Sequence, residues 1–429
     1  MLNKIYGKYK KALDVINIVC ASYVIFWTLA PIAIDVPILK IFILICGAFW
    51  LLTAIIISKS FLLNTKIIVL ITYFLIGYIA LSTYFSLGPY GFSTQIRMMI
   101  YLYYTLFYVF YSKYLLGSLK ILFTFTLVVI AVFGTITFIA HLDFVTVSRY
   151  ITHGDPGFEK LLARGIGAYN LIFTVAMMLP LLLYYLLKAD WKYPLLKFKR
   201  KIGEISKKEK SISVAVQSAL IMLFVLLCML IGIAKFTYAT MTVFICFTVI
   251  FMSYLKRKTN IIIIVSILSA FLVAAILIVF DLIVVPKEYA SYLSKFSFLI
   301  KSIVSGQPLG PVAHKLSLYG QSVRMMFRYP LGGLVYIPES IAGGHSYVLD
   351  TLATFGIIIG LLINFISLRI PLIDIKKGKE YRVLAISLSV AVLLVLGLDS
   401  LPYGCGVVMF VGFPFIKELR GAKGEDKTT

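Results

Sequence analysis

Long apolar runs alternate with short polar segments along most of this chain. A helix needs roughly 20 apolar residues to cross a bilayer core of about 30 Å, and runs of that length recur about twelve times. The predicted spans are 13–34, 38–58, 67–87, 97–116, 120–141, 167–187, 212–234, 237–255, 260–284, 345–368, 382–400 and 402–417. The pattern therefore predicts an all-α polytopic transmembrane bundle, with residues 1–429 forming a single integral membrane domain.

The composition agrees with this pattern and narrows the choice of partners. Of the 429 residues, 61% are hydrophobic and only 14% are charged, whereas about 25% of residues are charged in ordinary soluble domains. The formal net charge of +23 arises from Lys and Arg residues that stand between the apolar runs. That distribution favours contact with anionic membrane lipids and argues against a nucleic-acid partner.

The positions of the basic residues also predict the orientation in the membrane. An even number of spans places both termini on one side, and if that side is cytoplasmic, 29 of the 41 Lys and Arg residues fall in cytoplasmic segments. The positive-inside rule favours this orientation. It makes 188–211 a basic cytoplasmic loop and assigns 142–166 and 281–344 to outer loops.

The larger outer loop is predicted to carry short amphipathic helices. Apolar residues recur at helical spacing over 287–304, which is typical of a helix that lies on the membrane surface. A second helix is predicted over 314–328, because Tyr329-Pro330-Leu331-Gly332-Gly333 is a turn-forming sequence. The segment that follows leads to His345, at the outer start of a predicted span.

Several chemically suggestive residues follow one another in this region. Lys315 lies fifteen residues before Pro330, and Tyr319 lies four residues after Lys315. The next span opens with His345-Ser346 and continues with Leu349, Leu352, Gly356 and Gly360. Farther upstream, the end of the first outer loop reads Arg164-Gly165-Ile166-Gly167-Ala168-Tyr169-Asn170.

This ordered combination resembles the signature of the O-antigen ligase/polymerase superfamily of bacterial envelope glycosyltransferases. In that family an Arg, an aromatic residue, a Pro-Leu-x-Gly turn and a His-Asn/Ser motif occur in this order, and an Arg-Gly element precedes them. The resemblance implies a GT-C-like fold in the bacterial cytoplasmic membrane. It also implies transfer of a glycan from undecaprenyl diphosphate to a sugar hydroxyl at the outer face.

The chemistry of that reaction suggests a role for each candidate. Cations stabilise a departing diphosphate, and a base that is neutral near pH 7 activates the acceptor hydroxyl. We expect His345 to be the base and Arg164 and Lys315 to hold the diphosphate as catalytic residues. The further substrate-binding candidates are Arg324, Arg328, Tyr319, Asp350 and Arg97. No cofactor and no metal are expected, since the diphosphate ester stores the energy.

One departure from the family pattern leaves two alternatives open. The family Arg is replaced by Lys315, which keeps the charge but loses the bidentate fork that suits phosphate oxygens. Either Lys315 acts as a point charge, or Arg324 or Arg328 takes over the role. The other histidines, His141, His153 and His314, are interpreted as loop residues.

The predicted function is polymerisation of lipid-linked repeat units of an O-antigen, capsule or exopolysaccharide. The donor and acceptor are then both undecaprenyl-diphosphate-linked glycans, and a chain-length regulator and a flippase are expected as protein partners. A ligase that transfers the glycan to another acceptor is one alternative. A flippase or transporter for lipid-linked oligosaccharides, or a non-catalytic member of an envelope complex, are the others.

Overall fold

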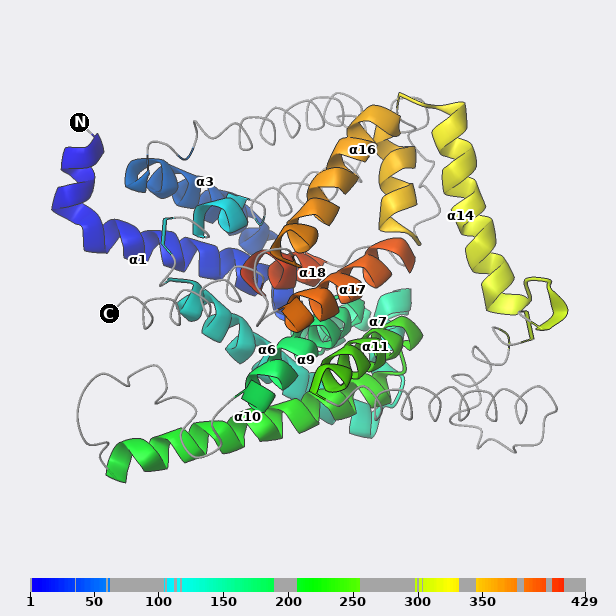
Figure 1. The fold of residues 1–429 in the computed structure, drawn as a ribbon, viewed down its shortest axis with the longest axis horizontal. Helices are drawn as coiled ribbons and strands as arrows, with labels where there is room; N and C mark the ends of the chain where they lie inside the picture. Colours follow the sequence, from blue (N-terminus) through cyan, green and yellow to red (C-terminus); the bar gives the residue numbers. More distant parts are fainter. Residues whose placement is uncertain are drawn as a thin grey trace. The chain divides into compact units, whose positions relative to one another are not determined.

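The computed structural model describes residues 2–34, 36–58, 61, 104, 106–111, 114–115, 118–188, 207–254, 298, 301–302, 304–331, 345–375, 382–398 and 403–412. Every regular element within these ranges is helical, as the sequence predicts (Figure 1). The elements are α1 (Leu2–Leu29), α2 (Pro31–Ile34), α3 (Pro37–Ile57), α6 (Ser118–Asp143), α7 (Val147–His153), α8 (Phe158–Ala163), α9 (Tyr169–Lys188), α10 (Lys207–Ala234), α11 (Thr237–Tyr254), α14 (Gly310–Arg328), α16 (Tyr347–Ile375), α17 (Arg382–Leu398), α18 (Tyr403–Val407) and the π-helix η2 (Val408–Gly412). The chain divides into two compact units, one formed by 1–243, 369–392 and 402–429, and the other by 244–368 and 393–401.

Most predicted spans that fall on described residues coincide with one helix each. The helices α3, α6, α9, α10, α11 and α17 match the spans 38–58, 120–141, 167–187, 212–234, 237–255 and 382–400 to within about five residues. The predicted first span is interrupted at Ala30, between α1 and α2, and the predicted last span begins with the short α18 and η2. The spans 67–87 and 260–284 and most of 97–116 lie outside the described residues.

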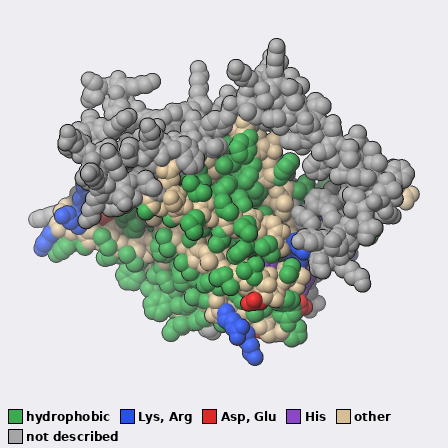
Figure 2. All heavy atoms as spheres, turned by 90° about the horizontal axis from the view of Figure 1, so that it is seen from below, with side chains coloured by type: hydrophobic (Ala, Val, Ile, Leu, Met, Phe, Trp, Pro, Cys, Tyr) green, Lys and Arg blue, Asp and Glu red, His purple; other side chains and the backbone are tan. Residues whose placement is uncertain are grey.

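The described helices have the length and surface expected of a membrane protein. Among the described residues, Gly7–Leu29, Ser118–Asp143 and Ala215–Ala234 are long and apolar enough to cross a bilayer. Large apolar side chains on α3, α6 and α10 point outward, including Phe42, Phe49, Val128, Met222 and Met229. Figure 2 shows hydrophobic side chains over most of the described surface in view. Such a surface is stable in contact with lipid.

One group of polar side chains is buried in the first unit, and its members are hydrogen-bonded to one another. Asn17 is fully buried, and its Nδ2 donates to Thr53 Oγ1 at 2.8 Å. The Tyr111 hydroxyl donates to Asn17 Oδ1 at 2.6 Å and accepts a hydrogen bond from Trp50 Nε1 at 3.0 Å. Because buried polar groups are costly unless they are paired, this network fixes how α1 packs on α3.

Helix α9 is the centre of the first unit. Every described side chain from Leu171 to Tyr184 is buried, and α6, α10 and α18 pack against it. At its start, Asn170 Nδ2 donates to the Thr28 carbonyl and Asn170 Oδ1 accepts from the Gly404 N–H, both at 2.7 Å. One amide side chain therefore links the end of α1, the start of α9 and the start of α18.

The outer loop predicted at 142–166 is largely helical. It folds into α7 and α8, which share a small core of Val147, Ile151, Leu162 and Ile166. Helices of seven and six residues are too short to produce a clear apolar period, which explains why the sequence did not predict them.

In the second unit, α14 confirms the helix predicted over 314–328 and begins four residues earlier, at Gly310. Gly310 has a φ of +51°, and a side chain there would meet the ring of Phe298 at 2.9 Å. The Ser302 hydroxyl accepts a hydrogen bond from the Leu309 N–H at 2.9 Å. The surface helix predicted over 287–304 otherwise lies outside the described residues.

Helix α16 corrects the prediction of one continuous span over 345–368. Gly356 has φ +81° and ψ 171°, a conformation reserved almost entirely for glycine, and the helix breaks there. Figure 1 shows the two arms, Tyr347–Phe355 and Ile357–Ile375, on either side of this bend. A Cβ on Gly360 would lie 2.7 Å from Leu352 Cα, so the backbones of the two arms pack directly on each other. The break therefore makes α16 a helical hairpin.

The hairpin divides the predicted span into two arms of unequal length. At 1.5 Å per residue the first arm is about 13 Å long, too short for a core of about 30 Å, while the second arm is about 28 Å long. Asn364, eight residues after Gly356, donates through Nδ2 to the carbonyl of Val348, eight residues before it, at 3.1 Å. The start of the first arm, with His345, therefore lies beside the middle of the second arm.

Candidate functional site

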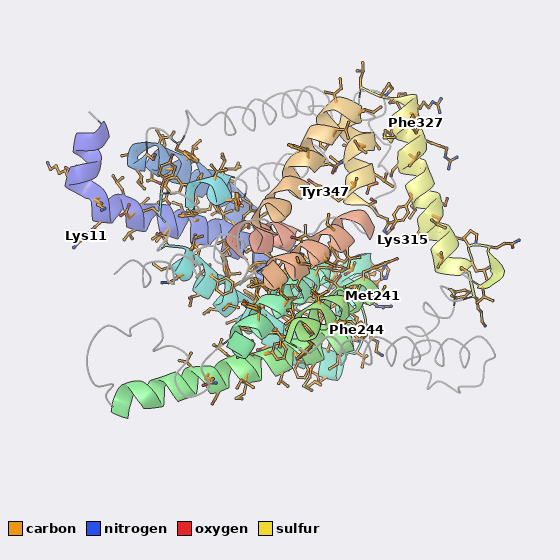
Figure 3. All side chains as sticks on the ribbon, in the orientation of Figure 1. Lys11, Met241, Phe244, Lys315, Phe327 and Tyr347 are labelled. Atoms are coloured by element: carbon orange, nitrogen blue, oxygen red, sulfur yellow. The ribbon has the colours of Figure 1, made fainter. Side chains whose placement is uncertain are left out.

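The candidate site is built on one face of α14. Lys315, Tyr319 and Ser322 are four and three residues apart, which places them along one face of the helix. Ser322 is buried, and Lys315 and Tyr319 are half-buried. Figure 3 shows Lys315 on the side of α14 nearest the start of α16, where Tyr347 is labelled. This stripe is the part of α14 that faces the rest of the unit.

The two arginines of α14 lie away from this stripe. Arg324 and Arg328 are both exposed. Arg324 Nε donates to the Gly320 carbonyl at 3.2 Å, and the Arg328 guanidinium lies 5.6 Å from the ring centroid of Tyr329. Of the three cations considered as the counterpart of the family Arg, Lys315 alone lies on the inward stripe.

The Asp350 carboxylate joins α14 to the start of α16. Its Oδ1 accepts a hydrogen bond from the Ser322 hydroxyl at 2.6 Å, and its Oδ2 accepts one from the Ser346 N–H at 3.0 Å. Ser346 is the residue immediately before α16, and its N–H has no carbonyl partner within the helix. The carboxylate thus satisfies an N-terminal donor of α16 and fixes α14 against it.

This arrangement gives Asp350 a role in positioning. Both of its carboxylate oxygens are engaged by protein donors, as expected for a carboxylate that is half-buried next to an apolar helix. His345 is half-buried and precedes Ser346 directly. The His345 imidazole therefore lies at the end of α16 that Asp350 connects to α14 through Ser322.

Asn364 is a second polar residue at this level of the hairpin, and sequence reasoning missed it. It is buried, its Nδ2 bonds Val348, and its Oδ1 has no partner among the described residues. A lone Asn in an apolar run is a signal that the sequence did carry, because such residues are rare in membrane helices. Ser322 was also missed, since a serine on a helix has no distinctive pattern.

Arg164 lies in the first unit, at the end of α8. The chain stops the helix there with a Schellman motif: the Gly165 N–H donates to the Leu162 carbonyl, and the Ile166 N–H to the Leu161 carbonyl. Gly165 has a φ of +83°, which explains why glycine follows the arginine. The Arg164 side chain is exposed.

The predicted site residues thus fall into three groups. The second unit brings Lys315, Tyr319, Asp350 and His345 to one end of its helical hairpin, and it carries Arg324 and Arg328 on the exposed face of α14. Arg164 belongs to the first unit, so its meeting with Lys315 and His345 stays a prediction. Arg97 lies outside the described residues.

Comparison with known proteins adds no family assignment. No protein-family model matches the chain, and no curated protein is similar enough to count as a relative.

Proposed function

We propose that this protein is a membrane glycosyltransferase that polymerises undecaprenyl-diphosphate-linked oligosaccharide repeat units at the outer face of a bacterial cytoplasmic membrane. One observation carries the proposal. The α14 face with Lys315 and Tyr319 is fastened, through Ser322 and Asp350, to the start of α16, directly after His345. Lys315 and His345, which resemble parts of the family motif and are thirty positions apart in sequence, thus belong to two segments that the Ser322–Asp350 hydrogen bond connects.

The chemistry of these residues suits transfer from a diphosphate donor. The acceptor hydroxyl oxygen attacks the anomeric carbon of the donor sugar while the bond from that carbon to the diphosphate oxygen breaks. The hydroxyl proton passes to the His345 imidazole, and the Lys315 ammonium stabilises the negative charge that develops on the departing diphosphate. Displacement in one step inverts the anomeric configuration.

The proposal extends to the parts of the chain around this site. A twelve-span GT-C-like bundle with cytoplasmic termini would place the loops 142–166 and 281–344 at the outer face, where a polyprenyl-linked sugar is accessible. Arg164 would then supply a second cation to the diphosphate. Asn364 Oδ1, which has no hydrogen-bond partner within the part of the chain that the structure describes, offers an acceptor for a hydroxyl donor beside the start of α16.

A flippase for lipid-linked oligosaccharides is a second candidate, and the broken α16 favours it. Discontinuous helices near the bilayer midplane form the substrate sites of many transporters, and Gly356 interrupts α16. The two candidates predict different intermediates. A blocked polymerase leaves single repeat units on the lipid at the outer face, whereas a blocked flippase leaves them at the cytoplasmic face.

The test uses cells that make the glycan and carry His345→Ala or Lys315→Ala. We expect long polymer to disappear and single lipid-linked repeat units to accumulate at the outer face, while the amount of protein in the membrane stays unchanged. Matched controls are His153→Ala and His314→Ala, which alter exposed residues of the two predicted outer loops and should leave polymer length normal.

Two results would overturn the proposal. Accumulation of the repeat units at the cytoplasmic face would support the flippase instead. Normal polymer length in His345→Ala would remove the imidazole from the mechanism altogether. Purified protein incubated with lipid-linked repeat units then separates a polymerase, which forms a ladder of products, from a ligase, which needs a different acceptor.

A further inference from the structure

His141 is a buried residue at the end of α6 and not the loop residue that its sequence position predicts. Only 1% of its surface is exposed. Its Nδ1 lies 2.8 Å from the Val145 carbonyl oxygen, and its Nε2 lies 2.9 Å from the Ser148 hydroxyl oxygen. Both ring nitrogens are therefore within hydrogen-bond distance of protein groups, and the ring joins the end of α6 to α7.

The same network holds the segment that follows Arg164. The Ser148 hydroxyl donates to the Gly167 carbonyl at 2.7 Å, and the Gly167 N–H donates to the Thr137 hydroxyl at 2.7 Å. Ser148 and Thr137 are both fully buried. Two hydroxyls, one from α7 and one from α6, thus fix the backbone at Gly167, three residues after Arg164.

The three hydrogen bonds that involve His141 and Ser148 require a particular protonation state of the imidazole. The Val145 carbonyl can only accept, so Nδ1 must carry a proton. The Ser148 hydroxyl has one proton, and when it donates that proton to Gly167 its oxygen can only accept from Nε2. All three hydrogen bonds therefore exist together only when the ring carries two protons.

The neutral tautomer with its proton on Nε2 would set the lone pair of Nδ1 against the Val145 carbonyl oxygen at 2.8 Å. In the neutral tautomer that keeps the hydrogen bond to Val145, Nε2 has no proton, and the Ser148 hydroxyl has two acceptors for its one proton. It either donates to Nε2 and leaves the Gly167 carbonyl without its donor, or donates to Gly167 and leaves Nε2 facing an oxygen lone pair. Among the described residues, Lys235 acts on the ring through its positive charge, and Arg149 on α7 donates to the Lys235 carbonyl.

We propose that His141 is a positioning residue whose protonation decides whether Ser148 holds Gly167, and thereby how firmly the Arg164–Gly167 segment is fixed. In the doubly protonated state Ser148 bonds Gly167 and the segment is held from both sides. In the neutral state Ser148 turns to the ring and Gly167 keeps only the Thr137 contact. The inference rests on the hydrogen bonds alone and is independent of the proposed function.

The test measures hydrogen–deuterium exchange of peptides covering 164–168 in the full chain, reconstituted in lipid nanodiscs. Exchange is followed from about pH 3.5 to about pH 8.5, a range extended on the acid side of the usual titration of histidine because the ring is buried, and is corrected for intrinsic chemical exchange. We expect protection to fall by about three- to tenfold as the pH rises, the change that corresponds to losing one hydrogen bond.

Three variants make the test specific. His141→Gln cannot titrate, and Ser148→Ala cannot donate to Gly167, so both should lose the pH-dependent step, with Ser148→Ala poorly protected at every pH. His153→Gln, an exposed histidine at the end of α7, should keep the step. If the wild-type protein shows no step, or if His141→Gln or Ser148→Ala retains it, the proposal is wrong.

Discussion

The Ser322 hydroxyl donates a 2.6 Å hydrogen bond to Oδ1 of Asp350 and thereby connects two helices that are separated in sequence by the turn at Pro330. The same carboxylate accepts the Ser346 N–H through its other oxygen. Because the acceptor is charged, this contact belongs to the stronger class of protein hydrogen bonds. It makes the start of α16, and with it His345, dependent on α14.

Removing either partner of this contact should destabilise the second unit. A hydrogen bond to a charged group contributes about 1.5 to 3 kcal/mol, so Ser322→Ala and Asp350→Ala should each lower the thermal unfolding midpoint. The double variant should be little worse than the worse single variant, because both changes break the same contact. Gln321→Ala, on the exposed face beside Ser322, is the control; additive losses would contradict the pairing.

The three cationic side chains of α14 should differ in their importance for activity, because Lys315 lies on the inward stripe and the two arginines do not. Lys315→Ala should abolish polymer formation, and Lys315→Arg should preserve much of it because the charge stays on the inward stripe. Arg324→Ala and Arg328→Ala should leave activity nearly unchanged, since both side chains are exposed. The lengths of the glycans made by cells carrying each variant check this, and a severe loss in Arg324→Ala with normal Lys315→Ala would reverse the assignment.

The two glycines of α16 should not tolerate a side chain. An alanine at 360 would place Cβ 2.7 Å from Leu352 Cα and 2.9 Å from the Thr351 carbonyl oxygen, both of which are backbone atoms. An alanine at 356 would have to adopt a φ of +81°, at a cost of about 1 to 3 kcal/mol. Either change should lower thermal stability in detergent.

A matched glycine distinguishes this effect from a general sensitivity of membrane helices to substitution. Gly232 in α10 has no atom within 4 Å of its Cβ position, so Gly232→Ala should be neutral or slightly stabilising, as alanine favours helix. Unchanged stability of Gly360→Ala would indicate that the two arms of α16 do not pack as described.

Asn170 should be among the most sensitive positions of the first unit. Asn170→Ala leaves the Thr28 carbonyl and the Gly404 N–H without their partner, and each such buried group costs about 1 to 3 kcal/mol. We expect a clear drop in the unfolding midpoint, measured by intrinsic fluorescence. Gln307→Ala, which removes an exposed amide side chain, should cause none; equal effects of the two changes would exclude the linking role of Asn170.

The all-helical class and the positions of most described helices could be predicted from sequence, because long apolar runs can be counted along the chain. The helix over 314–328 was predictable for a similar reason, as Pro330 ends it. The break at Gly356 could not be predicted, since glycine is tolerated within a helix. The positive φ of Gly356 accompanies the packing of Gly360 on Leu352, which is a tertiary contact.

For the candidate site, too, some features could be predicted from sequence and others depend on tertiary contacts. The order of Lys315, Tyr319, His345 and Ser346 is a property of the sequence, and it was enough to nominate them. That Lys315 faces inward while Arg324 faces outward, that Asp350 is occupied by Ser322 and Ser346, and that His141 is buried became visible only in the tertiary structure. Sequence spacing determines which residues share a helix face, but contact with another segment decides which face is buried and which hydrogen bonds it makes.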